Sequence, residues 1–107
     1  MTDQNNKIQE MQLIEQNLQN ILLQKQAFQM ELSETTSALK EVDKSSEQVF
    51  KIIGQLMIQT DKKKMVEELK NKEKILDLRI NSIEKQETSF TEQLDKLREE
   101  VMKGVKK

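Results

Sequence analysis

The chain has 107 residues, of which 35% are charged and 35% hydrophobic, and its formal net charge is −1. It has no proline, two glycines and 3% aromatic residues, a composition that is poor for a globular core and typical of long helices. The small net charge argues against a nucleic-acid partner, and no apolar run is long enough to cross a membrane, so neither partner is expected.

A first long helix is predicted from about residue 7 to residue 44. Its apolar residues alternate at spacings of three and four, the 3.5-residue repeat of coiled coils. The polar residues 1–6 are expected to fray, and the segment Asp43–Glu47 is expected to be a turn or linker. The seam positions of this helix are Met11, Ile14, Leu18, Ile21, Lys25, Phe28, Leu32, Thr35, Leu39 and Val42.

A β-hairpin is predicted at residues 49–60, with strands at 49–53 and 56–60. β-Branched and aromatic residues favour strands here. Gly54 and Gln55 separate the two apolar runs, and Gly-X is a type II′ turn signal because glycine accepts the positive φ of the first position. The residues expected to serve in assembly are Val49, Phe50, Ile52, Ile53, Gly54, Leu56, Met57 and Ile58.

A second long helix is predicted from about residue 62 to residue 103, with Thr60 or Asp61 as its N-terminal cap and Gly104 after its end. The run of lysines at 62–64 lies in its first turn, where the helix dipole disfavours cations. This run is interpreted as a solvated charge run, or as a basic patch for an acidic partner. The seam positions are Val66, Leu69, Glu73, Leu76, Ile80, Ile83, Glu87, Phe90, Leu94, Leu97 and Val101.

The two seams mirror each other about Gly54. Ile14 and Leu94 lie equally far from residue 54 on opposite sides, as do Leu39 and Leu69. Residues 1–48 have four lysines against eight acids, whereas residues 61–107 have thirteen basic residues against eleven acids. The fold class is therefore mostly α: a long antiparallel two-helix coiled coil joined by one β-hairpin, a single domain over residues 1–107.

Four seam positions are polar. The mirror relationship predicts that Thr35 faces Glu73, where a hydroxyl can hydrogen-bond a carboxylate. Lys25 and Glu87 lie one layer apart and within reach of each other. Polar seam layers fix register at some cost in stability. A local opening or a contact with a partner is the alternative interpretation.

No catalytic set is present. The chain has no His and no Cys, which excludes the usual zinc sets and the nucleophile–histidine dyads. It has no glycine-rich phosphate-binding motif either. We therefore expect a binding protein without metal or cofactor, not an enzyme, and the lack of Cys fits an intracellular, cytoplasmic protein.

The hairpin requires neighbours from outside the chain. Pairing across Gly54 and Gln55 leaves apolar groups on both faces, and both edges have unpaired backbone groups. Because an isolated two-stranded hairpin is only marginally stable in water, further strands are needed. We expect other copies or a related subunit to supply them.

The free ends of the helices gather further apolar residues, several of them off the seam. Coiled-coil ends fray easily, and fraying exposes flexible Met side chains that adapt to irregular partners. These residues are the predicted binding site: Ile8, Met11, Leu13, Ile14, Leu18, Leu94, Leu97, Val101, Met102 and Val105.

The run from Phe50 to Thr60 (FKIIGQLMIQT) and the stretch from Arg79 to Glu87 (RINSIEKQE) resemble the prefoldin family, and the resemblance extends over residues 8–103. The single hairpin is similar to the β-type subunit. The resemblance implies a hexamer of two α-type and four β-type subunits, with a platform of intersubunit β-barrels and six coiled coils. It further implies that the coil tips hold non-native client proteins and pass them to a group II chaperonin without ATP.

Two alternatives remain at this point. One is a structural coiled coil that serves as a spacer or tether in a larger complex. The other is a parallel homodimer in which the two halves of one chain never meet, although it gives no reason for the symmetry about Gly54.

Overall fold

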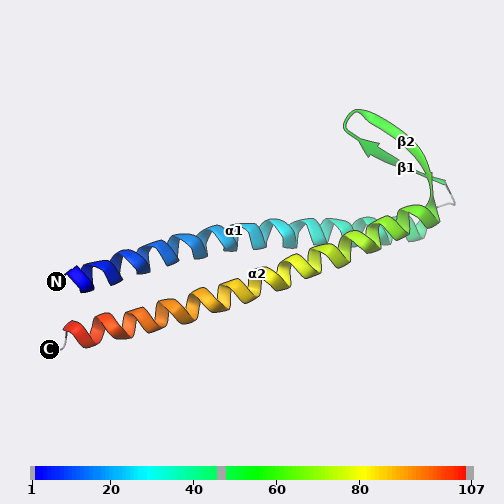
Figure 1. Cartoon of the computed structure of the whole chain (residues 1–107). Helices are drawn as coiled ribbons and strands as arrows, with labels where there is room; N and C mark the ends of the chain where they lie inside the picture. The colour runs from blue at the N-terminus through cyan, green and yellow to red at the C-terminus, as the bar shows by residue number, and fades with distance from the viewer. Residues whose placement is uncertain (1, 46–47, 106–107) are drawn as a thin grey trace. The chain divides into compact units, whose positions relative to one another are not determined.

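The structure is a computed structural model that describes residues 2–45 and 48–105, and the side chains of all of these except residues 2, 48 and 105. Helix α1 (Thr2–Lys44) leads into strands β1 (Gln48–Ile53) and β2 (Leu56–Asp61), and helix α2 (Lys62–Val105) follows (Figure 1). This order confirms the predicted helix–hairpin–helix fold. Two parts are compact in themselves: residues 1–27 with 81–107, here the terminal part, and residues 28–80, here the hairpin part.

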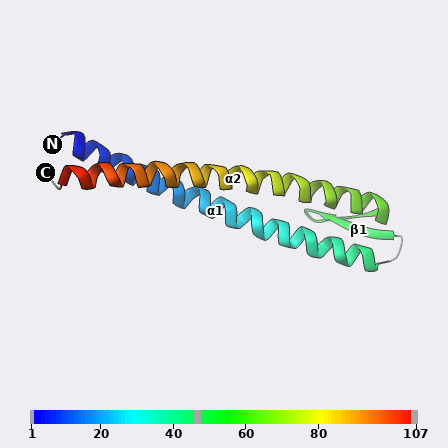
Figure 2. The same cartoon turned by 90° about the horizontal axis from the view of Figure 1, so that it is seen from below.

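In the terminal part, the first half of α1 packs antiparallel against the second half of α2. Three ion pairs establish the antiparallel direction. The nearer the α1 residue lies to the N-terminus, the nearer its α2 partner lies to the C-terminus. These pairs are Lys25–Glu87, Glu15–Arg98 and Lys7–Glu100. The start of α1 and the end of α2 lie side by side in both views (Figures 1 and 2). The core of this part is formed by the predicted seam residues Ile14, Ile21, Ile83 and Leu94.

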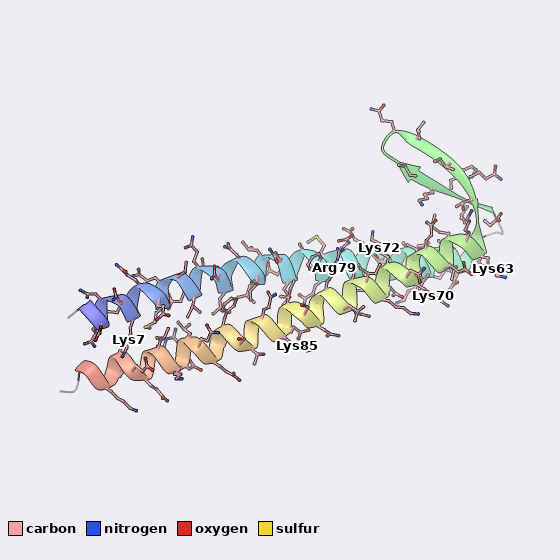
Figure 3. The ribbon with its side chains drawn as sticks, viewed as in Figure 1. Lys7, Lys63, Lys70, Lys72, Arg79 and Lys85 are labelled. Carbon is pink, nitrogen blue, oxygen red and sulfur yellow. The ribbon has the colours of Figure 1, made fainter. Side chains whose placement is uncertain are left out.

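In the hairpin part, the remaining helix segments are also antiparallel. The Arg79 guanidinium of α2 lies 5.7 Å from the centre of the Phe28 ring, within cation–π range. Lys72 pairs with Glu31 at 3.3 Å. Figure 3 labels both basic residues along α2. Leu76 is 2% exposed and Ile80 is also buried. The two halves of one chain therefore contact each other, which rules out a parallel homodimer in which they never meet.

The hairpin has the predicted register. β1 and β2 are antiparallel, with Ile53 opposite Leu56 and Gln48 opposite Asp61. Gly54 has φ = +61°, and Gln55, the second turn residue, has a negative φ. A positive φ at only the first central position is the pattern of a type II′ turn, so the turn chemistry of Gly-X is confirmed.

The helices are longer than predicted at both ends of the chain. α1 begins at Thr2 rather than near residue 7, with Asp3 in its first turn, where a negative charge complements the helix dipole. α2 continues through Gly104 to Val105. At the other end of α1, the Ser45 N–H and hydroxyl both donate to the Val42 carbonyl, at 3.1 and 2.7 Å. The rest of the expected linker, residues 46 and 47, lies outside the described residues, as do residues 1, 106 and 107.

Within the part of the chain that the structure describes, neither helix contains a stretch that is long and apolar enough to cross a membrane.

Candidate functional site

The hairpin presents large apolar side chains to solvent. Their exposed fractions range from 43% for Ile58 to 69% for Ile52, and the pairing places them on both faces of the two strands. Val49 is half-buried, and Gly54 is exposed at the turn. Large exposed apolar surfaces are typical of interaction sites, and the use of this one for assembly stays a prediction. The exposed members of the predicted assembly set are Phe50, Ile52, Ile53, Leu56, Met57 and Ile58.

A groove of about 580 Å³ lies beside β1 in the hairpin part. The Lys51 ammonium donates to the Glu68 carboxylate at 2.8 Å at the edge of this groove, which joins the hairpin to α2. Figure 2 shows β1 along the ends of α1 and α2. Sequence periodicity does not predict this ion pair, because a spacing of seventeen residues matches no helix or strand period. The apolar residues lining the groove are Ala38, Val42, Val49, Phe50, Ile52, Met65 and Leu69.

Lys62 has a specific partner, unlike a member of a solvated charge run. Its ammonium donates to the Asp43 carbonyl at 2.9 Å and to the Ser45 carbonyl at 3.4 Å. These carbonyls lie at the C-terminal end of α1, where the helix dipole places a partial negative charge. Lys62 therefore begins α2 and also caps α1.

The polar seam residues pair in one case as predicted and in another with a neighbour. Lys25 donates to Glu87 at 3.0 Å, which confirms the expected contact. Glu73, however, accepts from the Thr36 hydroxyl at 3.0 Å and not from Thr35. The Thr35 hydroxyl is buried and donates to the Glu31 carbonyl, one turn earlier in its own helix. The prediction for Thr35 was wrong because a seam threonine can satisfy its hydroxyl within the helix.

The predicted binding residues at the helix ends fall into three groups. Ile14 and Leu94 are buried, and Met11, Leu18, Leu97 and Val101 are half-buried. Ile8, Leu13 and Met102 are 40%, 58% and 57% exposed. The side chain of Val105 lies outside the described residues. Of the nine described side chains, the helix ends therefore expose three and hold the other six in the seam.

Charged side chains surround this apolar seam. A groove of about 270 Å³ exposes parts of Ile14 and Leu97 between Glu10, Lys96 and Glu100. Lys7, labelled in Figure 3, lies 3.5 Å from the Glu100 carboxylate. Four of the six residues that line this groove are polar or charged, so its apolar floor consists of Ile14 and Leu97 alone.

Gln4 was predicted to lie in a frayed end and Gly104 to follow the end of the second helix, but the two residues meet. Gln4 Nε2 donates to the Val101 carbonyl at 2.9 Å, and the Gln4 amide lies directly against Gly104. The signal was present in the sequence, because Gln4 and Gly104 are equally far from residue 54 and continue the mirrored seam. The apolar pattern does not mark them, because neither residue is apolar.

Apolar side chains that lie off the seam are exposed to solvent. They are spread along both helices, with exposures from 39% to 69%, and they comprise Leu22, Leu23, Met30, Ile75 and Leu78. Among the described residues, no group of three or more carboxylates gathers to hold a metal ion.

Comparison with known proteins agrees with this geometry. The family model described as "Prefoldin subunit" matches residues 5–107. The prefoldin subunit beta of Thermococcus onnurineus is 38% identical over 94 residues, which cover 86% of this chain and 81% of that protein. The prefoldin subunit beta of Pyrobaculum arsenaticum is 38% identical over 88 residues, covering 80% and 71%.

Solved structures show the same fold. The crystal structure of the prefoldin beta subunit from Thermococcus strain KS-1 superimposes with a TM-score of 0.90 at 32% identity, over 97% of this chain and 93% of that one. The beta2 subunit from the same strain gives a TM-score of 0.73 at 19% identity, over 81% and 95%. Sequence, fold and hairpin thus agree, and the chain belongs to the prefoldin family of chaperone subunits.

Proposed function

We propose that this chain is a β-type subunit of an ATP-independent chaperone that holds non-native proteins. It assembles through its hairpin with an α-type subunit and further copies of itself, as a hexamer of two α-type and four β-type subunits. The helix ends bind clients in the cytoplasm, and a group II chaperonin receives them.

The exposed hairpin is the observation that carries this proposal. Phe50, Ile52 and Met57 are 61%, 69% and 66% exposed on a sheet of only two strands. Within the described residues the sheet has no third strand, so the unpaired strand edges and apolar faces call for strands from other subunits. The similarity to proteins named as subunits supports the same step.

The helix ends suit weak, sequence-tolerant binding. Ile8, Leu13 and Met102 are exposed there, and Met in particular adapts to partners of different shape. One such patch binds weakly, but several patches on one assembly act together, because each further contact is made at high effective concentration. Release then requires only competition for the patches.

The assembly step is tested by native mass spectrometry after mixing with an α-type subunit. The wild-type chain is expected to form a hexamer, and Phe50→Asp with Ile52→Asp to remain in small species because charge is placed between strands that must pack. Leu78→Asp is the matched control, since Leu78 is 69% exposed on α2 away from the hairpin. A hexamer that survives the double substitution contradicts the platform.

Client binding is tested by light scattering of a denatured test protein. Replacing Ile8, Leu13 and Met102 by Ser is expected to weaken suppression of aggregation while the hexamer persists. These three are chosen because they are exposed, whereas Met11 and Leu97 also pack in the seam. Unchanged suppression would favour the alternative role, a structural spacer or tether in a larger complex.

A further inference from the structure

We infer that Gln4 and Gly104 form a clasp that holds the helix ends together and thereby controls how much apolar seam a client can reach. The inference rests on the proposed function, because it concerns the access of clients to the same helix ends. Gln4 and Gly104 act here as positioning residues and need not touch the client.

The clasp consists of one hydrogen bond and one close approach. Gln4 Nε2 donates to the Val101 carbonyl at 2.9 Å, in a partly buried position. A Cβ on residue 104 would lie 2.8 Å from Gln4 Nε2 and 2.9 Å from Gln4 Oε1. Real Cβ atoms do not approach this closely, so an alanine at residue 104 would make the Gln4 amide shift from the place where it reaches the Val101 carbonyl.

Neither helix propensity nor a left-handed backbone explains the glycine at residue 104. α2 runs through Gly104 to Val105, and glycine is an unfavourable residue inside a helix compared with alanine. Its conformational freedom is not used either, since Gly54 is the glycine with positive φ. The close packing of the Gln4 amide is therefore the physical reason that the structure offers for this residue.

Opening of the clasp would change the surface next to it. Met11, Leu97 and Val101 are half-buried in the seam, and Val101 carries the carbonyl that Gln4 holds. Among the described residues, the next ion pair is Lys7–Glu100 at 3.5 Å, with both side chains more than a third exposed, and such pairs contribute little. When the Gln4 hydrogen bond breaks, Met11, Leu97 and Val101 become accessible in addition to the exposed Ile8, Leu13 and Met102.

The first test measures amide hydrogen exchange by mass spectrometry on the assembled protein. Gln4→Ala is expected to speed exchange about fivefold in segments 3–14 and 94–104, the factor that corresponds to loss of one ordinary hydrogen bond. Exchange in segment 28–80 should not change, which separates local opening from general loss of stability. Gln12→Ala, at an exposed glutamine of the same helix, is the matched control.

A double substitution makes the test specific to the contact. By helix propensity alone, Gly104→Ala should slow exchange about fourfold. If the clasp exists, Gly104→Ala in the wild-type chain should speed exchange, because the new Cβ displaces the Gln4 amide. The same substitution made in the Gln4→Ala variant should slow exchange. Equal slowing in both backgrounds, or unchanged exchange in Gln4→Ala, overturns the clasp.

Client capture is then measured on the same variants by suppression of aggregation. Gln4→Ala is expected to reach half-suppression at a several-fold lower chaperone concentration. In one outcome, Gln4→Ala opens the helix ends without improving capture, whereas replacement of Ile8, Leu13 and Met102 by Ser still weakens capture. That outcome overturns the inference and leaves the proposed function standing. If neither change affects capture, the proposed function itself fails.

Discussion

The Lys25 ammonium donates a hydrogen bond to the Glu87 carboxylate at 3.0 Å across the seam of the terminal part, and the two side chains are only 20% and 31% exposed. Ile21 and Ile83, the mirror partners of Glu87 and Lys25, are buried. An ion pair among buried isoleucines costs desolvation, and it is satisfied only when the helices keep this alignment. The pair therefore acts as a register lock.

Replacing one residue of the Lys25–Glu87 pair should lower the free energy of unfolding more than replacing both residues. Lys25→Leu alone is expected to lower the free energy of unfolding by about 2 kcal/mol, since the Glu87 carboxylate is left partly buried without its cation. Lys25→Leu with Glu87→Leu should recover most of this loss or exceed the wild type. The measurement is urea unfolding at one fixed protein concentration, because subunit association also affects stability.

The Glu15–Arg98 pair provides the matched control for this lock. The two side chains are 50% and 53% exposed, and their charged groups lie 3.6 Å apart. The same single and double substitutions to Leu should therefore yield a coupling free energy of about 0–1 kcal/mol between the two residues. A coupling at Lys25–Glu87 no larger than this would contradict the register lock.

Two adjacent threonines should respond differently to removal of their hydroxyls. Thr36 donates to the Glu73 carboxylate, whereas buried Thr35 donates to a backbone carbonyl of its own helix. Thr36→Val is expected to lower the free energy of unfolding by about 1–2 kcal/mol, because a partly buried carboxylate loses its donor. Thr35→Val should be close to neutral, since the Glu31 carbonyl lies mid-helix where the backbone ladder also satisfies it.

Thermal or urea unfolding of the two valine variants decides between the two arrangements. A larger loss for Thr35→Val would instead favour the pairing of Thr35 with Glu73 that the mirror relationship predicted. Glu73→Gln adds an independent check, because it should weaken the effect of Thr36→Val and leave that of Thr35→Val unchanged.

Most of the fold could be predicted from the sequence because two strong patterns coincide. The alternating spacing of three and four requires that the apolar stripes pack, and Gly54 provides a reversal at the point about which they mirror each other. The hairpin register follows as well, because a two-residue turn places Ile53 opposite Leu56.

The remaining features depend on the reach of individual side chains, which periodicity does not encode. The mirror relationship places Thr35 and Glu73 in one layer but does not say which hydroxyl the carboxylate reaches. Local rules predicted frayed ends, whereas Gln4 bonds to Val101, a residue far away in sequence. The surfaces for assembly and for clients remain predictions, since exposure alone does not identify what covers an apolar side chain.

Gly54 should be required for its backbone conformation and not for space. A Cβ at this position would meet no atom within 4 Å, but its φ of +61° is unfavourable for most L-residues. Gly54→Ala is expected to destabilise the hairpin by about 1 kcal/mol, and Gly54→Asn by less, because Asn tolerates the left-handed region.

Assembly with an α-type subunit, followed by analytical ultracentrifugation, reports this loss as a higher dissociation constant. Gln55→Ala is the neighbouring control, because Gln55 has a negative φ and needs no special residue. If Ala and Asn at position 54 behave alike, backbone strain does not determine the choice of glycine.

The cap that Lys62 provides to α1 should be separable from the two lysines that follow it. Lys62→Ala is expected to speed amide exchange at residues 40–45, because the Asp43 and Ser45 carbonyls lose their cationic donor. The free energy of unfolding should fall by about 0.5–1 kcal/mol.

Lys63 and Lys64 are exposed in the first turn of α2, where the helix dipole disfavours positive charge. Lys63→Glu or Lys64→Glu should therefore be neutral or stabilise α2 by a few tenths of a kcal/mol. If Lys62→Ala behaves like these two, with no local effect on the end of α1, the ammonium does not act as its cap.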